Sequence, residues 1–285
     1  MNEYKFIVRD KIKEFLKEDL GYGDITSESL ISRDQEAKAK LYFKEPGVVS
    51  GLTEASIVFS LLGCEPSIYV DEGTKTEERK TLMEISGLAR AILMGERLAL
   101  NLVGRMAGIA TKTSKVVEIA HEGSPDVRIA ATRKTVPGLR IFDKRAIVHG
   151  GGDPHRFGLD DCVLIKDNHL ELLPSITEAI RRTREKVSFT KKIEVEVRSL
   201  EGAIEAAEAG ADIIMFDNMS PSEIIENLGV LRKKGLREGF LFEASGGITI
   251  GNISEYAVTG VDVISLGSLT HSVDSLDVKL EIEMM

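Results

Sequence analysis

The sequence predicts an α/β protein with an N-terminal α+β sandwich domain followed by a reduced, roughly six-stranded α/β barrel. Two observations lead to this prediction. The first part of the chain mixes helical and strand-like stretches without a regular order. After about residue 127, short apolar strands alternate with helical stretches, as in parallel sheets whose strands are joined by crossover helices. At 285 residues, the chain is also longer than one hydrophobic core usually supports.

The first domain is predicted over residues 1–104. Its strand-like stretches alternate apolar and polar residues, and turn residues such as Pro46-Gly47 separate them. Gly21-Tyr22-Gly23-Asp24 ends the first helix. The expected elements are helices over about residues 4–18 and 53–62, and strands over residues 37–43, 67–70 and 82–85.

A long helical stretch from about residue 88 to residue 122 joins the two domains. We expect it to be interrupted near Gly104 and Gly108, because glycine in a helix interior costs about 1 kcal/mol relative to alanine. The domain boundary is therefore placed at residue 104. For the C-terminal segment, residues 270–285, a return to the N-terminal domain is one option.

The barrel is predicted over residues 105–269. A full barrel of eight units needs about 250 residues, so this shorter section predicts a reduced one. The expected strands cover residues 127–131, 163–165, 193–197, 213–216, 240–242 and 261–265, with helices over 176–184, 200–209, 222–233 and 253–257.

The composition argues against several classes of protein. A formal net charge of −9 disfavours a nucleic-acid-binding module, although a local basic cluster can still receive an anionic substrate. No apolar run approaches the ~20 residues of a membrane helix, and the N-terminus lacks the apolar core of a signal peptide. Cys64 and Cys162 are far apart in the sequence and fit reduced thiols. We expect a cytoplasmic protein that binds neither nucleic acid nor membrane.

Polar residues gather at or just beyond the carboxyl ends of the predicted barrel strands. In α/β barrels this rim holds the active site, because loops from many strands meet at one mouth. One such coincidence would be weak, whereas a series along the whole barrel predicts a site. In strand order the residues are Arg133 and Lys134, Lys166, Glu196, Asp217, Ser245-Gly246-Gly247 and Gly267-Ser268.

The last two loops predict a phosphate site. Glycine lets a ligand approach backbone N–H groups closely, and a helix following Gly247 would direct its positive end at the anion. Barrel enzymes often hold phosphate after their final strands. Ser245-Gly246-Gly247 alone fits a tight turn equally well, but Gly267 one unit later favours the phosphate site.

Basic residues in the earlier loops predict an anionic substrate. Thr132-Arg133-Lys134 follows the first barrel strand, His155-Arg156 comes next, and Lys166 follows the second strand. Arginine binds carboxylates through paired hydrogen bonds, whereas lysine acts as a mobile point charge. Solvated surface charge is the plainer explanation for any one of them. The run Gly150-Gly151-Gly152 before His155 favours a loop of unusual backbone geometry.

Two carboxylates complete the candidate set. Glu196 and Asp217 can accept hydrogen bonds from hydroxyl groups or hold Mg²⁺, which prefers a few oxygen ligands together with phosphates and water. Glu194 shares the parity of Glu196, so the sequence leaves open which of the two faces the site. Asp217 could equally cap the following helix. His169 has no partners at zinc spacing, and we expect it to have a structural role in its loop.

These residues stand in motifs that resemble those of the quinolinate phosphoribosyltransferase family. The likeness covers nearly the whole chain, and the motifs follow the family's order. The matching segments are EDLGYGDIT at residues 18–26, ERLALN at 96–101, TRKTVPG at 132–138, GGGDPHRFGL at 150–159, LIKDNH at 164–169, EVEV at 194–197, FDN at 216–218, SGG at 245–247 and LGSLTHS at 266–272.

The resemblance implies that quinolinate reacts with phosphoribosyl pyrophosphate, with Mg²⁺ as cofactor, to give nicotinate mononucleotide, carbon dioxide and pyrophosphate in NAD biosynthesis. It also implies at least a homodimer in which Arg97 reaches the partner's site. The residues it assigns are Thr132, Arg133, His155 and Arg156 for the pyridine substrate, Lys134 and Lys166 for the pyrophosphate and reacting groups, Glu196 and Asp217 for ribose hydroxyls and metal, and Ser245, Gly246, Gly247, Leu266, Gly267 and Ser268 for the 5′-phosphate.

Two departures from the family motifs leave alternatives open. Ala131 stands where an acidic residue often precedes the TRKT motif, and Pro154 stands where asparagine often precedes the His-Arg pair. Both lie beside proposed substrate contacts, so a sister transferase for another heterocycle is one alternative. A Schiff-base aldolase that uses Lys166 is a second, from a different class. A catalytically silent sensor of nucleotide sugars is a third.

Overall fold

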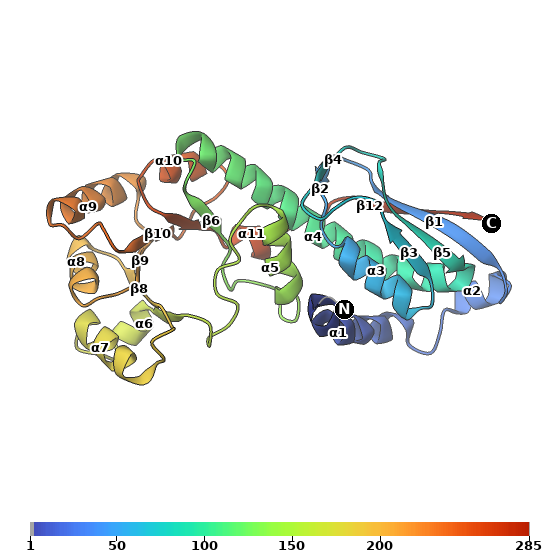
Figure 1. Cartoon of the computed structure of the whole chain (residues 1–285), viewed down its shortest axis with the longest axis horizontal. Coiled ribbons are helices and arrows are strands. Elements are labelled where there is room, and N and C mark those ends of the chain that lie inside the picture. Colours follow the sequence, from blue (N-terminus) through green and yellow to red (C-terminus); the bar gives the residue numbers. More distant parts are fainter. Residues whose placement is uncertain (1–2, 285) are drawn as a thin grey trace. The chain divides into compact units, whose positions relative to one another are not determined.

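The computed structural model describes residues 3–284, which divide into two compact units, each with its own sheet (Figure 1). The architecture confirms the predicted fold class, with an α+β sandwich first and a six-stranded parallel sheet second. Residues 1, 2 and 285 of the predicted domains lie outside the described residues. Within the described part of the chain, every helix is too short or too polar to cross a membrane.

The first unit contains residues 3–112, 148–151 and 273–284 and is built around an antiparallel sheet. Its inner strand β1 (Glu36–Phe43) alternates exposed and buried residues over its first half, as the sequence pattern predicts. β5 (Thr81–Leu88) pairs along one edge of β1, and the C-terminal strand β12 (Val278–Met284) pairs along the other. With β3 (Glu65–Ile68) beside β5, the strand order is β12-β1-β5-β3.

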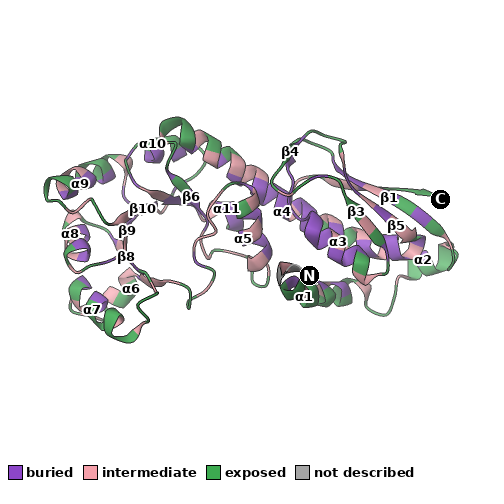
Figure 2. Cartoon of the chain, in the orientation of Figure 1, coloured by how far each residue is buried: buried purple, intermediate pink, exposed green. Residues whose placement is uncertain are grey.

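Helices and a small hairpin complete the first unit. α3 (Leu52–Leu61) is buried over most of its surface, which its run of apolar residues explains (Figure 2). Asp24 begins α2 (Ile25–Leu30), because its side chain accepts the N–H groups of Thr26 and Ser27 at 3.1 Å. The remaining elements are α1 (Glu3–Leu20), β2 (Gly47–Val48) and β4 (Lys75–Thr76).

The predicted interruption of the long helix is wrong. α4 (Ala89–Gly123) is continuous for 35 residues, straight through Gly104 and Gly108. These glycines are needed for close packing: a Cβ at Gly108 would lie 2.1 Å from the carbonyl oxygen of Asp274. The Leu276 amide also donates to the Gly104 carbonyl at 3.0 Å. Contact with the C-terminal segment therefore explains the glycines, and the units divide between Lys112 and Thr113.

The second unit contains residues 113–147 and 152–272 and holds the parallel sheet, in the order β6-β11-β10-β9-β8-β7. No strand pairing joins β6 to β7 among the described residues, so the sheet is not closed by hydrogen bonds between those two strands. β10 reaches Ser245, three residues beyond the predicted end at residue 242. The strands are β6 (Arg128–Ala130), β7 (Val163–Ile165), β8 (Ile193–Val197), β9 (Ile213–Asp217), β10 (Leu241–Ser245) and β11 (Val263–Ser265).

Serine caps begin three consecutive crossover helices and fix where the preceding loops end. Ser175 and Ser199 accept the N–H groups of Glu178 and Gly202, each at 3.1 Å. Ser220 forms a capping box with Glu223, and Pro221 follows it at the first helical position. The helices of this unit are α5 (Arg140–His149, which runs two residues beyond it), α6 (Asp167–Leu170), α7 (Ile176–Lys186), α8 (Leu200–Glu208), α9 (Pro221–Lys233), α10 (Ile253–Ala257) and α11 (Ser268–His271).

Candidate active site

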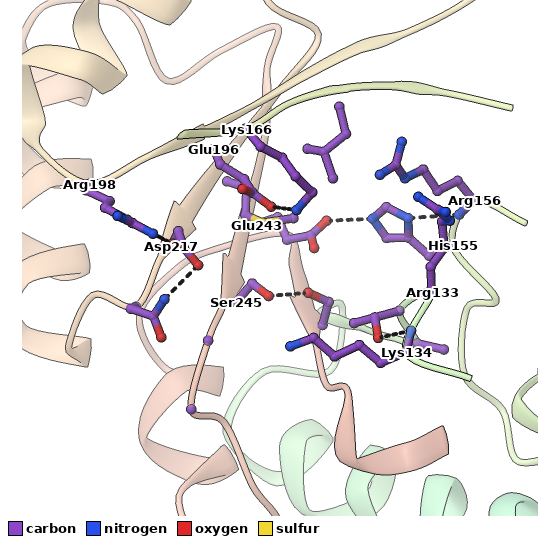
Figure 3. A pocket seen from close by; sticks show the side chains of 18 residues that line it. Arg133, Lys134, His155, Arg156, Lys166, Glu196, Arg198, Asp217, Glu243 and Ser245 are labelled. Carbon is purple, nitrogen blue, oxygen red and sulfur yellow. Dashed lines mark hydrogen bonds and ion pairs between the residues drawn. The ribbon is translucent and has the colours of Figure 1, made fainter. Parts of the chain in front are cut away.

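A pocket of about 570 Å³ lies at the carboxyl ends of the barrel strands, within the second unit (Figure 3). Its size suits a small-molecule ligand, since such sites typically measure about 300–1,000 Å³. Most of the polar residues predicted from the strand ends meet here. The lining residues are Ala131, Thr132, Arg133, Lys134, His155, Arg156, Leu164, Lys166, Glu196, Arg198, Met215, Asp217, Asn218, Glu243, Ser245, Gly246, Gly247 and Ser265.

Four predicted site residues do not line this pocket. Arg97 is exposed on α4 in the first unit. Leu266 is buried, and its amide donates to the Ala130 carbonyl at 2.9 Å. Gly267 lies behind Lys134, where an added Cβ would come within 2.9 Å of the lysine Cδ. Ser268 begins α11.

Three cations in the pocket have no acidic partner in the described part of the chain. Arg133, Lys134 and Arg156 form no ion pair within residues 3–284, although acidic side chains line the same pocket. Nε of Arg133 is buried and has no hydrogen-bond partner in this part of the chain. Arg156 is only 9% exposed, and its guanidinium donates to the Cys162 carbonyl at 3.1 Å. Arg133 is half-buried and Arg156 is buried, whereas Lys134 is exposed. Positive charge gathered in one pocket in this way favours an anionic ligand.

The other two permanent cations are paired with the predicted carboxylates. Nζ of Lys166 donates to Glu196 from the neighbouring strand. Arg198 binds Asp217 through Nε at 3.0 Å and also reaches Asp167 at 2.9 Å. Asp217 therefore lines the pocket and does not cap α9, which begins at the Ser220 capping box. Glu196 faces the pocket, while Glu194 lies fully buried beneath it.

The glycine loop after β10 has the geometry that its sequence suggests. Gly246 has φ +95° and Gly247 has φ +64°, in a region that favours glycine. A Cβ on Gly246 would lie 2.8 Å from the backbone nitrogen of Asn218, which donates to the Ser245 carbonyl. The helix predicted over residues 253–257 after Gly247 is present with those bounds. A Thr249–Asn252 turn separates this helix, α10, from the two glycines.

A buried lysine supports the loop that carries His155 and Arg156. Lys144, on α5, is fully buried, and its ammonium donates to the Pro154 carbonyl. Burial and then the charge of Arg140 lower the pKa of Lys144 to about 8. Sequence reasoning missed this residue because α5 itself was not predicted. His169 has the expected structural role, since its Nδ1 accepts the Lys166 amide at 3.0 Å.

Sequence reasoning also missed several lining residues as site residues. Arg198 directly follows β8, so the strand-end rule could have found it. Glu243 shares the parity of Ser245, but the predicted strand stopped at residue 242 and left both outside it. Ser265 is the last residue of β11, and its hydroxyl donates to the Ser245 hydroxyl at 2.9 Å. The alternation of side chains along the strand could have placed Ser265 at the pocket.

Family models match both parts of the chain. Residues 24–107 match the model described as quinolinate phosphoribosyl transferase, N-terminal domain. Residues 109–281 match the corresponding C-terminal domain.

Individual proteins are similar over almost their whole length. A probable nicotinate-nucleotide pyrophosphorylase [carboxylating] of Methanothermobacter thermautotrophicus is 46% identical over 273 residues, covering 96% of this chain and 98% of the relative. The human nicotinate-nucleotide pyrophosphorylase [carboxylating] is 38% identical, covering 89% of this chain and 85% of its own. The crystal structure of NadC from Streptococcus pyogenes superposes with a TM-score of 0.92 at 36% identity, covering 99% and 98% of the two chains.

Proposed function

The chain belongs to the quinolinate phosphoribosyl transferase family, and on that premise we propose that it transfers phosphoribosyl from phosphoribosyl pyrophosphate to quinolinate. The products are nicotinate mononucleotide, carbon dioxide and pyrophosphate, a step of NAD biosynthesis. One observation carries this proposal beyond the family likeness. Arg133, Lys134 and Arg156 bring three positive charges without acidic partners, among the described residues, into one pocket beside a glycine loop.

The pyridine diacid is assigned to the side of the pocket lined by Arg133 and Arg156. Two carboxylates on adjacent ring carbons need several donors, and the guanidinium fork suits each of them. Nε of Arg133, which has no hydrogen-bond partner among the described residues, is one such donor. Thr132 and His155 line the pocket beside them. Both ring nitrogens of His155 already have hydrogen-bond partners, so we assign the main contacts with the substrate carboxylates to the arginines.

Lys134 and Lys166 are assigned to the departing pyrophosphate. As the bond to the ribose carbon breaks, the sugar gains oxocarbenium character and negative charge grows on the leaving oxygens. Ammonium groups already in place stabilise that charge without reorganising, and losing one such donor typically costs about 10²–10³ in rate. The Lys166–Glu196 bond holds its ammonium at the pocket before substrate arrives. After transfer, the positively charged ring nitrogen draws electrons from the adjacent carboxylate bond and eases loss of carbon dioxide.

The sugar phosphate is assigned to the opposite side, at Ser245, Gly246 and Gly247. The two glycines carry no side chain, so their backbone allows an anion to approach the amides closely. Glu196 and Asp217 then face the ribose hydroxyls as hydrogen-bond acceptors. The segment after β11 packs behind Lys134, and its Thr270 hydroxyl donates to the Lys134 carbonyl at 2.9 Å. We therefore keep its residues in the proposed phosphate site as support for Lys134: Leu266, Gly267 and Ser268.

We propose Mg²⁺ as the cofactor on the chemistry of the donor set. Glu196 and Asp217 offer carboxylate oxygens in a pocket whose remaining ligands would be phosphate oxygens and water, which is the mixture that Mg²⁺ prefers. Both side chains are less than one-fifth exposed, at 12% and 16%. When bound, the ion neutralises phosphate oxygens.

We also propose a homodimer in which Arg97 completes the partner's site. Arg97 is exposed on α4 and absent from the pocket of its own chain, which supports a role across an interface. Two inactive variants, Arg97→Ala and Lys134→Ala, should regain activity when mixed, because one of the two sites in a mixed dimer is intact. Failure of this complementation under conditions that exchange subunits would argue against the shared site.

The reaction itself is tested with purified protein, quinolinate, phosphoribosyl pyrophosphate and Mg²⁺, with nicotinate mononucleotide measured by chromatography. A panel of other heterocycles, including nicotinate, tests whether Ala131 and Pro154 alter substrate choice. Absence of product from quinolinate would contradict the proposal.

The aldolase alternative is not favoured. Lys166 is hydrogen-bonded to the carboxylate of Glu196 and lacks the apolar surroundings that activate a Schiff-base lysine. Borohydride trapping should leave Lys166 unmodified.

A further inference from the structure

One arginine on α5 joins the two loops that carry the pocket arginines. Nε of Arg140 donates to the Thr135 hydroxyl at 3.1 Å, and its Nη1 donates to the Phe157 carbonyl at 2.9 Å. Phe157 directly follows Arg156 in the sequence. Thr135 is tied to Arg133, because its amide donates to the Arg133 carbonyl at 2.9 Å. A single guanidinium therefore connects the neighbours of both arginines.

Lys144 lies one turn further along α5 and contacts the second loop at another point. Its ammonium donates to the Pro154 carbonyl and lies 5.9 Å from the centre of the Phe157 ring. The side chain is fully buried, where a cation is costly unless it is hydrogen-bonded. An apolar side chain of similar length would avoid this cost, so the lysine points to a need for the Pro154 contact.

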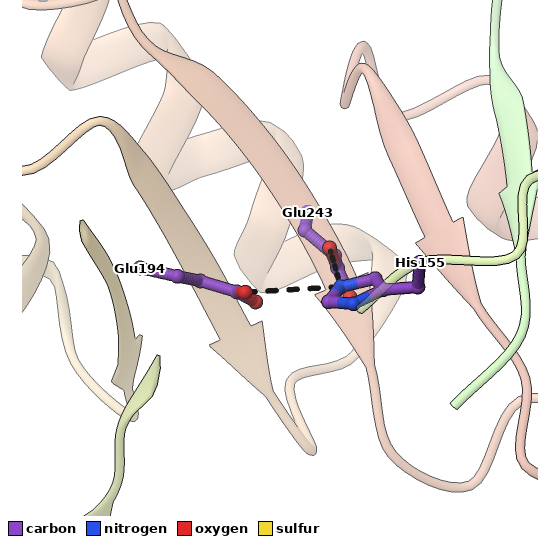
Figure 4. A group of neighbouring side chains, drawn as sticks. All are labelled: His155, Glu194 and Glu243. Atoms are coloured by element: carbon purple, nitrogen blue, oxygen red, sulfur yellow. Dashed lines mark hydrogen bonds and ion pairs between the residues drawn. The ribbon is translucent and has the colours of Figure 1, made fainter. Parts of the chain in front are cut away.

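The second loop is also held by the sheet, so its path past the pocket is fixed from more than one element. Asp153 pairs with β6, and its carbonyl accepts the Ala131 amide at 2.9 Å. Nε2 of His155 lies 3.2 Å from Glu243 of β10 (Figure 4). His155 has φ +53°, which is uncommon for a residue with a side chain, so its backbone depends on such contacts. α5 supplies the contacts that flank Arg156 in the sequence.

The spacing of the two pocket arginines matters because the proposed substrate carries carboxylates on adjacent ring carbons. A guanidinium binds a carboxylate best through two parallel hydrogen bonds, and this geometry tolerates little displacement. A diacid has to satisfy Arg133 and Arg156 at the same time, whereas a monoacid needs only one of them. The relative position of the two loops therefore affects diacids more than monoacids.

We propose that Arg140 and Lys144 are positioning residues that set the spacing of Arg133 and Arg156, and so make the pocket selective for two adjacent carboxylates over one. Neither Arg140 nor Lys144 lines the pocket, so both act through the loops. Arg140 joins the two loops, and Lys144 keeps the second loop against α5 at Pro154. The selectivity rests on the proposed function, whereas the contacts that hold the loops do not.

Binding of two unreactive acids tests the selectivity. Phthalate has the two adjacent carboxylates of quinolinate but no ring nitrogen to accept the ribose, and benzoate has one carboxylate. Titration calorimetry on the full-length protein compares the two. Arg140→Gln should weaken phthalate binding about tenfold, the effect of losing one hydrogen bond to a charged group, and benzoate binding less than about twofold.

Arg237→Gln is the matched control. Arg237 is also half-buried and donates to a backbone carbonyl, that of Gly260 at 3.2 Å, but it lies at the amino end of β11, away from the pocket. This variant should change neither affinity. Equal losses of phthalate and benzoate binding in Arg140→Gln would overturn the selectivity role, and so would unchanged phthalate binding.

Lys144→Met provides a second, independent variant, because it keeps most of the buried volume and removes only the bond to the Pro154 carbonyl. It should shift the ratio of the two affinities in the same direction as Arg140→Gln. The comparison therefore remains decisive if Arg140→Gln does not fold. An unchanged ratio in Lys144→Met would overturn the role of Lys144.

Amide hydrogen exchange tests the hold on the second loop without any ligand. The amides of Arg156 and Phe157 donate to side chains of the same segment, so they are protected only while the loop keeps its shape. In Arg140→Gln and Lys144→Met they should exchange about tenfold faster, and in Arg237→Gln at the wild-type rate. Wild-type exchange in the first two variants would overturn the proposal. A protein that shows the faster exchange but binds neither acid would refute only the diacid site.

Discussion

The sheet of the first unit and the barrel mouth of the second unit use the same charged residue types in different ways. On the sheet, lysines pair with acids across exposed strands, as in Lys40–Glu283 at 3.4 Å, with both side chains at least 42% exposed. At the barrel mouth, charges converge on one pocket, and Arg133, Lys134 and Arg156 form no ion pair within residues 3–284. Water screens the first group, and we propose that the second group receives an anion.

Convergence on one pocket, together with the lower exposure of the two arginines, therefore distinguishes these charges from the solvated pairs on the sheet. An exposed pair such as Lys44–Asp277 contributes little, because its Coulomb energy in water is small and its side chains lose freedom. The two pocket arginines are less exposed, since Arg133 is half-buried and Arg156 is 9% exposed. Substitutions in the two regions should differ accordingly.

The largest effect is expected at the barrel mouth. Arg156→Ala should lower kcat/KM by about 10²–10³, because it removes a preorganised donor from the substrate anion. Thermal unfolding should show that the protein remains folded. Steady-state kinetics with quinolinate as the varied substrate measures the loss, and a rate close to that of the wild type would contradict the assignment.

The glycine loop should show a graded response. Gly247→Ala costs about 1–2 kcal/mol from its left-handed backbone, since nothing lies within 4 Å of the added Cβ. Gly246→Ala adds a clash with Asn218, and overpacking of this kind costs about 1–3 kcal/mol more. Urea unfolding midpoints of the two variants test this order, and equal midpoints would show that Asn218 moves aside freely.

Stability should depend on pH through Glu194, because burial and then the negative charge of Glu243 raise its pKa. Below the ordinary glutamate pKa of ~4.3, the carboxyl is neutral in both the folded and the unfolded chain. As pH rises toward the folded pKa of about 8, only the unfolded chain releases the proton, so stability falls. Glu194→Gln does not titrate, and its thermal midpoint should fall less over this range. Parallel curves for wild type and variant would contradict the buried proton.

The smallest effect is expected beside the sheet of the first unit, just after the end of β1. Lys44→Ala should change the free energy of unfolding by less than about 0.5 kcal/mol and leave turnover unchanged. Chemical denaturation and the same kinetic assay measure both. A large loss of activity would break the contrast between the two regions.

The sequence predicted the barrel well because strand periodicity and helix caps are local. Strands such as Val163–Ile165 and Ile193–Val197 match their predicted bounds. Eleven of the fifteen predicted site residues line the pocket, and the strand-end rule accounts for eight of them. The misses have non-local causes. Gly104 and Gly108 suggest a broken helix until the packed C-terminal segment is known. The sequence did not single out Glu243 and Lys144, because the full length of β10 and the presence of α5 were not predicted.

The central claim is that one barrel mouth receives a diacid beside a sugar phosphate. A crystal structure with quinolinate and an unreactive analogue of phosphoribosyl pyrophosphate tests it most directly. We predict the pyridine carboxylates within hydrogen-bond distance of Arg133 and Arg156, and the 5′-phosphate on the amides of Gly246 and Gly247. Quinolinate bound away from both arginines would contradict the account.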